Sequence, residues 1–229
     1  MARRKRKSNR GLAIAIAVVA AIALFIALNR ERLIDRFGAR PAPPQPSIDA
    51  LAHIDPAHDG TRVNVTGKLE AAQPPRDAEI GVGANAALLF RDVEMYQWRE
   101  TCAGAACRYE MTWSAQPIDS TKFRDAAGHV NPAPPFASKR FDAGGLRIGA
   151  HAVDAALVAA QLAPVALPVT AADLPPNLAA TFRVINGTLY AGADPSQPQV
   201  GALKVSYRVV ALGNVSLSGV QHGARLAAD

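Results

Sequence analysis

The chain has 229 residues, of which 49% are hydrophobic, so it is long enough to form one large or two small domains around an apolar core. Its formal net charge of +6 comes from one end. Residues 1–36 hold nine of the 25 basic and two of the 19 acidic residues, which leaves 16 basic and 17 acidic residues elsewhere. Because that remainder is nearly neutral, we expect no nucleic-acid partner.

An uncharged stretch near the N-terminus predicts a membrane anchor. Gly11–Leu28 is 18 residues without a charged or polar side chain, and a helix of that length covers roughly 27 Å, close to the hydrocarbon thickness of a bilayer. Six Lys and Arg in residues 1–10 place the N-terminus in the cytoplasm by the positive-inside rule. A cleaved signal peptide is the alternative, but no small-x-small cleavage site follows, so we expect an uncleaved signal anchor.

The remaining sequence predicts an extracytoplasmic domain. We expect a basic cytoplasmic tail (1–10), a single transmembrane helix (11–28), a Pro-rich linker (29–47) and the main domain (48–229). Short alternating runs separated by turn residues indicate an α+β fold that is mainly β, with an antiparallel sheet and short helices. The expected elements are a helical turn at 48–51, strands at 61–69, 80–84, 87–98, 146–150, 179–185, 188–191 and 202–211, a helix at 153–162, and an ordered excursion at 118–136.

Residues 90–114 predict a two-faced β-hairpin. Both cysteines and both tryptophans lie here, around a turn of small residues at 103–106. If Cys102 faces Cys107, the positions of facing residues sum to 209, which places Tyr96 opposite Trp113 and Arg99 opposite Glu110. One face is then aromatic and the other carries paired charges, and we expect the aromatic face to be core.

The two cysteines predict a structural disulfide. Zinc knuckles and thioredoxin-type redox pairs use a CxxC spacing, whereas Cys102 and Cys107 are separated by four residues, and zinc would need two more ligands. A compartment beyond the membrane permits disulfides.

A possible metal site lies at His53, Asp55, His58 and Asp59, which have ligand side chains at tight spacing. Nothing distant in the sequence completes a coordination shell, and the segment reads as a solvated turn. We therefore predict no metal and no cofactor.

Two further constellations suggest catalysis. Asp119, Ser120 and His129 resemble a triad, but no GxSxG elbow surrounds the serine, and a turn closed by side-chain hydrogen bonds is favoured. Glu94 lies on the aromatic face as a candidate acid, without a second carboxylate at fixed spacing. We expect no enzyme; a membrane-bound hydrolase or lipid-modifying enzyme using these residues is the alternative.

Several motifs make the chain similar to the transmembrane protein 43 (LUMA) family. They are the string Arg91–Trp98 with Glu94, Tyr96 and Gln97, then Glu100-Thr101, Tyr109, Trp113, Ile118-Asp119-Ser120, Phe123, Gly128-His129, Asn131-Pro132, Asp194-Pro195, Val200-Gly201 and Lys204–Tyr207. The resemblance implies a membrane protein with a large extracytoplasmic domain and no carried-over activity or cofactor. It also offers Glu94, Tyr96, Gln97, Trp98, Asp119, Ser120, His129 and Asn131 as binding residues.

The resemblance shapes the expected function and location. Eukaryotic relatives are found in the endoplasmic reticulum and inner nuclear membrane with partners such as emerin and lamins. The Ala and Arg content indicates a bacterial member with a periplasmic domain, to which those partners do not transfer. Relatives continue into further transmembrane helices, whereas this sequence ends at Asp229, which leaves a multi-spanning topology open. We expect a membrane-organising scaffold that contacts the bilayer and a membrane or periplasmic protein, or a second copy.

Overall fold

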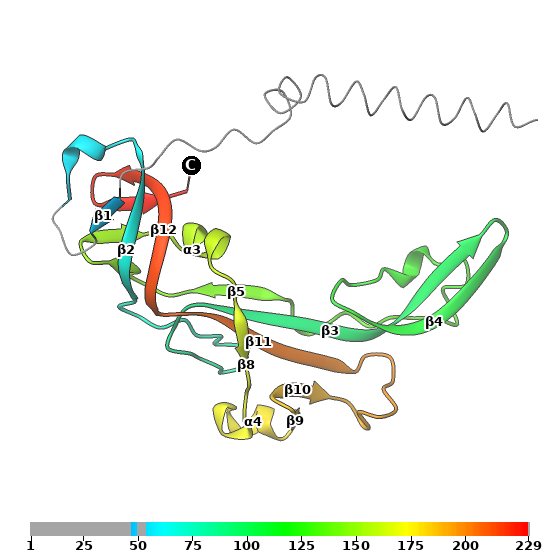
Figure 1. Cartoon of the computed structure of the whole chain (residues 1–229). Coiled ribbons are helices and arrows are strands. Elements are labelled where there is room, and N and C mark those ends of the chain that lie inside the picture. Colours follow the sequence, from blue (N-terminus) through cyan, green and yellow to red (C-terminus); the bar gives the residue numbers. More distant parts are fainter. Residues whose placement is uncertain (1–46, 50–53, 229) are drawn as a thin grey trace, which may run out of the picture. The chain divides into compact units, whose positions relative to one another are not determined.

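The computed structural model describes residues 47–49 and 54–228 (Figure 1). The predicted tail, transmembrane helix and nearly all of the linker lie outside the described residues. Within the described part of the chain, no helix is both long and apolar enough to span a bilayer. The anchor therefore stays a prediction.

The described residues confirm a mainly β fold. The helices are short: α3 (Ala155–Gln161), α4 (Pro176–Ala179) and 3₁₀ turns at Pro56–His58, Ser120–Lys122 and Ala171–Asp173. The strands are β1 (Ser47–Asp49), β2 (Arg62–Glu70), β3 (Ala86–Ala103), β4 (Ala106–Ser114), β5 (Lys139–Asp142), β6 (Arg147–Ile148), β7 (His151–Val153), β8 (Val165–Leu167), β9 (Arg183–Ile185), β10 (Thr188–Ala191), β11 (Leu203–Ala211), β12 (Gly213–His222) and β13 (Arg225–Ala227).

The first sheet is a closed ring of paired strands. Its order is β1-β2-β12-β13-β7-β6, and β2 also pairs with β6, which closes the ring. Alternate residues of β2 and β12 point to a shared apolar cluster, in which Val65, Leu69 and Leu217 are fully buried. Helix α3 contributes Leu157 and Val158 to the same cluster.

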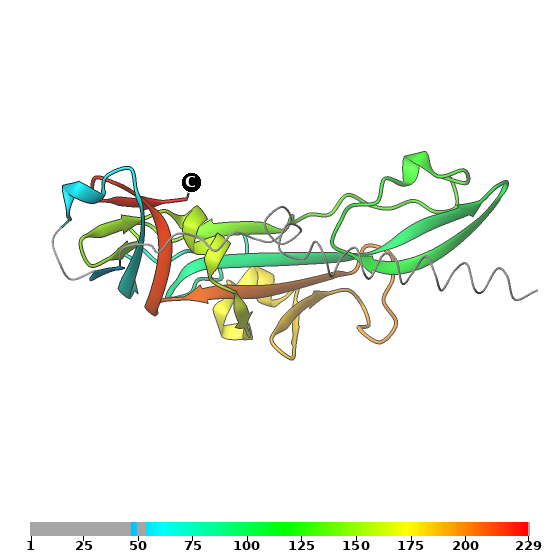
Figure 2. The ribbon, with the colours of Figure 1, turned by 45° about the horizontal axis from the view of Figure 1, so that its top comes forward.

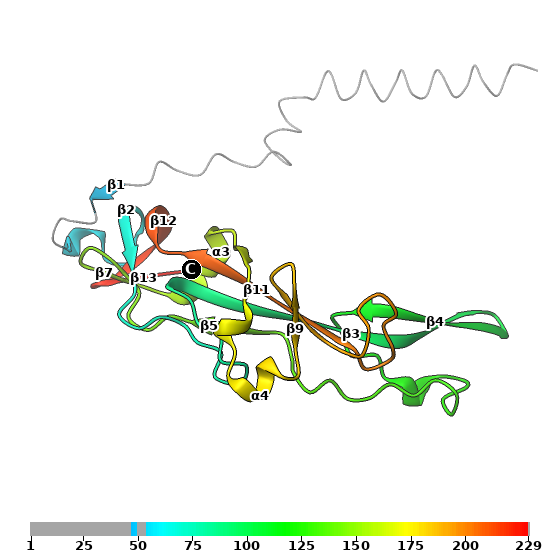
Figure 3. The ribbon, with the colours of Figure 1, turned by 90° about the horizontal axis from the view of Figure 1, so that it is seen from below.

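The second sheet is organised around β3, an 18-residue strand. The sheet order is β4-β3-β11-β10-β9, with β5 also on β3 and β8 on β11. Because successive side chains of a strand point to opposite faces, Leu88 packs in the first apolar cluster while Leu89 packs in the second. Figure 3 shows the first sheet near one end of β3 and β4 at the other.

Buried and half-buried side chains alternate along β3, and this pattern contradicts the prediction that its aromatic face is core. The odd-numbered positions Arg91, Val93, Met95 and Gln97 are buried, whereas Tyr96 and Trp98 are only half-buried. The second apolar cluster contains Val93 and Met95 and lacks both aromatic residues. The prediction that the aromatic face is core was wrong, because the apolar residues of 80–82 and 169–182 pack on the opposite face of β3, against Val93 and Met95.

A buried ion network holds β3 against β11. Arg91 Nη1 lies 2.8 Å from Asp77 Oδ2, and their side chains are 2% and 0% exposed. Tyr207 of β11 donates to the same carboxylate oxygen at 2.7 Å. Burial and this hydrogen bond raise the pKa of Tyr207 far above its usual range. Burial opposes the charge of Arg91, but Glu79 and Asp77 outweigh it and raise its pKa.

Three predicted elements differ from the structure, and some strands were not predicted. Residues 47–49 form a strand rather than a helical turn, because β1 pairs in parallel with β2. No strand forms at 80–84, where Asp77 N donates to Val82 O and closes a turn. Only Arg183–Ile185 of the 179–185 run is a strand. Strands β12 and β13 were not predicted; glycine and small polar residues interrupt the apolar alternation of β12.

A buried histidine lies in the ring of strands. His151 is 0% exposed, and neither of its ring nitrogens has a hydrogen-bond partner among the described residues. The side-chain oxygen of Gln221 is also unpartnered. Burial lowers the pKa of His151; the Gln221 side chain and the Ile148 backbone approach the ring and only partly offset this effect.

We expect Arg91→Leu to lower the free energy of unfolding by about 3–5 kcal/mol, because it leaves the Asp77 carboxylate buried without a counter-charge. The exposed Arg140–Asp142 pair supplies the control, and Arg140→Leu should cost less than about 1 kcal/mol. Urea denaturation of both variants measures the difference. Equal losses would show that the buried pair has no special role.

We expect the stability of the domain to fall as pH drops from about 7 to 5, since the unfolded histidine takes up a proton near pH 6.5 and the buried His151 resists it. Because the pKa of His151 is lower in the folded than in the unfolded protein, its contribution to stability is full above the unfolded pKa and is lost as the pH falls below it. His151→Gln should flatten the slope of unfolding free energy against pH, whereas the exposed His222→Gln should retain it. An unchanged slope in His151→Gln would contradict this expectation.

Candidate functional site

Most of the family-motif residues lie on the distal part of the β3–β4 hairpin, here called the arm (residues 95–114), or on the segment that follows it. Strand β11 pairs with β3 only as far as Leu203 opposite Met95, so the arm extends beyond the end of β11 (Figures 1 and 2). Residues 115–138, here called the connecting segment, lead from β4 to β5 and contact the arm along the way. Together the arm and the connecting segment form the candidate site.

The register of the arm confirms the prediction from the cysteines. Facing positions in β3 and β4 sum to 209, from Met95 opposite Ser114 to Cys102 opposite Cys107. The predicted disulfide joins the two cysteines. Arg99 pairs with Glu110 on one face, with Nε 3.0 Å from the carboxylate, and the Tyr96 and Trp113 rings are in contact on the other, with centroids 5.2 Å apart.

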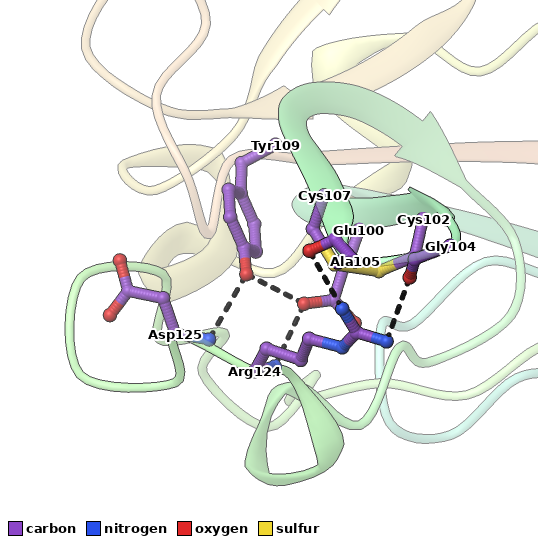
Figure 4. The surroundings of a disulfide bond; sticks show 8 residues. All are labelled: Glu100, Cys102, Gly104, Ala105, Cys107, Tyr109, Arg124 and Asp125. Atoms are coloured by element: carbon purple, nitrogen blue, oxygen red, sulfur yellow. Dashed lines mark hydrogen bonds between the residues drawn. A yellow bond between two sulfur atoms is a disulfide. The ribbon is translucent and has the colours of Figure 1, made fainter.

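The tip of the arm is held by Arg124 of the connecting segment (Figure 4). Its guanidinium donates to the carbonyl oxygens of Ala105 at 2.9 Å and Gly104 at 3.0 Å, beside the disulfide. Gly104 has a φ of +60°, a conformation that glycine adopts without strain in a two-residue turn. The backbone N–H of Arg124 donates to Glu100 at 2.8 Å, so one residue fixes both the turn and the strand before it.

An aromatic and acidic cluster continues from the tip along the arm. Tyr109 donates to Glu100 at 2.6 Å and accepts from the N–H of Asp125 at 3.0 Å (Figure 4). The hydrogen bonds from Tyr109 and from the backbone of Arg124 lower the pKa of Glu100. The hydrogen bond between Tyr109 and Glu100 raises the pKa of Tyr109. His129 stacks on Tyr109 with a 3.8 Å centroid separation and meets Trp98 edge-on at 4.7 Å.

Asn131 takes the place of a strand partner at the open edge of β3. Its Oδ1 accepts from the N–H of Trp98 at 2.7 Å, and its Nδ2 donates to the Trp98 carbonyl at 2.9 Å. This is the backbone position that a further residue of β11 would otherwise occupy. Asn131 belongs to the family motifs in the sequence, but only the end of β11 explains why an amide is required there.

Gln97 performs a similar role on the buried face. Its side chain is 1% exposed. The amide oxygen accepts from the N–H of Ile118 at 2.9 Å, and the amide nitrogen donates to the carbonyl of Gln116 at 3.2 Å. Gln97 and Asn131 therefore attach the connecting segment to β3 from two directions.

The residues of the predicted triad are not joined to one another. Ser120 Oγ accepts from the N–H of Asn131 at 2.9 Å, and Asp119 caps the turn by accepting from Thr121. The Nδ1 atom of His129 lies 3.0 Å from the carbonyl of Asp125. Within the described part of the chain, no hydrogen bond connects Asp119, Ser120 and His129. Their arrangement provides turn closure and packing.

Glu94 and the candidate metal-ligand residues Asp55 and Asp59 also lie among contacts that stabilise the fold. Glu94 is half-buried and lies opposite Lys204, whose ammonium lies 4.0 Å above the Trp113 ring. Asp55 accepts from the N–H of Ala57, and Asp59 from that of Gly223. His53 lies outside the described residues. Among those described, the ligand-type cluster is Glu100 with Cys102 and Cys107, whose sulfurs are joined to each other and unavailable to a metal.

A small cavity opens beside the arm, and no sequence pattern predicts it. It has a volume of about 230 Å³ and lies where β4 and β5 leave the same edge of β3 uncovered. Ser138 accepts from the N–H of Val93 in this gap, at 3.0 Å. Its lining is mostly apolar and includes Met95, Gln97 and Phe136.

The fold and site define a mainly β domain with a disulfide-closed arm held by a long connecting segment. Residues 95–228 match the family model for Transmembrane protein 43, which covers more than half of the chain and nearly all of the candidate site. The chain belongs to this family. This match confirms the family suggested by the motifs of the arm and connecting segment.

Individual relatives support the same assignment. Transmembrane protein 43 of Rattus norvegicus is 27% identical over 183 residues, which cover 73% of this chain and 44% of the rat protein. The Homo sapiens protein is 30% identical over 99 residues, which cover 38% of this chain and 25% of the human protein. The chain thus spans less than half the length of these relatives. No solved structure matches it.

We expect Asn131→Ala to release the connecting segment from β3, because it removes both hydrogen bonds to the Trp98 backbone. The Trp98 amide should exchange with solvent deuterium at least about tenfold faster, since a lost buried hydrogen bond costs about 1–3 kcal/mol. Asn131→Asp is the matched control, because it retains the acceptor for that amide. Unchanged exchange in Asn131→Ala would show that the connecting segment is held by other contacts.

Proposed function

We propose that this protein is a non-enzymatic binding or scaffolding protein anchored in a membrane. The anchor would keep the β domain near the bilayer while the arm binds another protein and so contributes to membrane organisation. Membership of the Transmembrane protein 43 family and the apolar run at 11–28 support the membrane location. The bilayer and a membrane or periplasmic protein, or a second copy of the chain, are the proposed partners.

The motif residues support this proposal because their side chains hold the arm and the connecting segment together. Gln97, Ser120 and Asn131 are each hydrogen-bonded within the arm and connecting segment. His129 is packed between two aromatic rings. Such contacts fix the shape of a surface in advance, which favours binding because little conformational entropy is lost when a partner binds. They also keep Ser120 apart from His129, so this serine has no neighbouring base among the described residues.

The proposed topology has the N-terminus in the cytoplasm and the β domain in the periplasm of a bacterial inner membrane. The basic residues before the apolar run support this orientation. The Cys102–Cys107 disulfide supports an oxidising compartment for the domain.

The alternative function, a membrane-bound hydrolase or lipid-modifying enzyme, would need Glu94, Asp119, Ser120 and His129 to converge. In the described residues these side chains contact different neighbours, so no observation favours this second candidate.

Crosslinking in intact membranes, followed by mass spectrometry, tests the binding function. We expect a crosslinked protein or oligomer whose yield falls when the exposed Met111 of the arm is changed to Arg. Val165 of β8 is also exposed and lies away from the arm, so Val165→Arg should retain the yield. Recovery of neither partner nor oligomer would contradict the proposal. A hydrolytic activity abolished by Ser120→Ala in a folded protein would favour the enzyme instead.

A further inference from the structure

Strand β4 is the outermost strand of the second sheet. In the part of the chain that the structure describes it pairs with β3 alone, so its other edge has no strand partner. An uncovered strand edge presents unpaired N–H and C=O groups, and proteins either block such edges or use them for binding. The residues on the β4 edge therefore decide which partner fits it.

The hydrogen bonds of β3 show which β4 groups point outward. Trp98 and Tyr96 direct their N–H and C=O groups away from β4, toward Asn131 and toward residues 201–202. In an antiparallel pair, residues facing such positions also direct their backbone groups outward. Their partners in β4 are Met111 and Trp113, and the same alternation adds Tyr109 and Cys107.

The charges of β4 favour an identical strand as partner. Arg108 and Glu110 flank Tyr109, and both side chains are exposed on the face opposite the aromatic one. Glu110 is paired with Arg99, whereas Arg108 has no ion-pair partner among the described residues. Two antiparallel β4 strands centred on Tyr109 would place each Arg108 opposite the Glu110 of the other copy.

Other antiparallel registers lose this match. The outward backbone groups require odd-numbered residues of one strand to face odd-numbered residues of the other. Centring on Arg108 or Glu110 meets this requirement but places two like charges opposite each other, which is destabilising. Centring on Met111 places Arg108 opposite Ser114 and Glu110 opposite Thr112, while centring on Cys107 places Glu110 opposite Gly104. The register on Tyr109 thus combines complementary charges with the twofold symmetry that homodimers prefer.

We propose that the arm pairs with the arm of a second copy of this chain, edge to edge and antiparallel, with Tyr109 at the twofold axis. This inference rests on the proposed binding function and names its partner. In the pair, each Glu110 lies between Arg99 of its own chain and Arg108 of the other, and the backbone groups of Cys107, Tyr109 and Met111 are paired.

Charge exchange tests this register in the full chain. Arg108→Glu gives a strand with two acidic residues and Glu110→Arg a strand with two basic ones, so each variant alone should dimerise about tenfold more weakly. Mixed together, the two variants should form a heterodimer with at least the wild-type affinity. Fluorescence-detected sedimentation in detergent measures both, and circular dichroism checks folding. Arg140→Glu on β5 is the control that should change nothing.

A backbone variant gives a second test that does not depend on charge. Met111→Pro removes an outward N–H but no hydrogen bond to β3, so it should weaken the dimer while the β3–β4 amides stay protected from exchange. A wild-type chain that is monomeric, or a dimer insensitive to the charge variants, their mixture and Met111→Pro, would overturn the self-pairing. If the monomeric chain still crosslinks to another protein, the binding function survives without it.

Discussion

The length of β3 is the constraint on which the rest of the structure depends. Its first half must satisfy two apolar clusters at once, which it does by placing Leu88 in one and Leu89 in the other. Its second half extends past the end of β11 and would leave backbone groups without partners on that side. The connecting segment resolves this problem, because Asn131 satisfies Trp98 and Gln97 holds Ile118.

This constraint explains why the family motifs lie where they do. Arg91 lies in the proximal half of β3, where its buried pairing with Asp77 fixes the strand against Tyr207 of β11. Arg124 at the other end secures the turn beside the disulfide. Between them the connecting segment covers the aromatic face and one edge of β3, while the outer edge of β4 is free of strand partners among the described residues. The proposed binding surface is therefore the outer edge of β4, which pairs with no other described strand.

Catalysis-like patterns in the sequence have structural explanations here. In the sequence, Ser120 resembles a nucleophile because an aspartate and a histidine lie near it. In the structure it accepts from Asn131 N, and His129 is stacked between Tyr109 and Trp98. Spacing along an irregular segment predicts little about side-chain convergence, because each turn can redirect the chain.

The sequence by itself determined the register of the arm, the disulfide, the family and the predominance of strands. Those features depend on local alternation and on neighbouring residues, which are visible without a fold. The tertiary structure decided which face of β3 is buried, because the residues that pack on that face, among them Val169, Leu174 and Phe182, come from a distant part of the chain. It also decided the closed ring formed with β12 and the role of Asn131 as a strand substitute. These features arise from pairings between residues far apart in sequence, which no local pattern specifies.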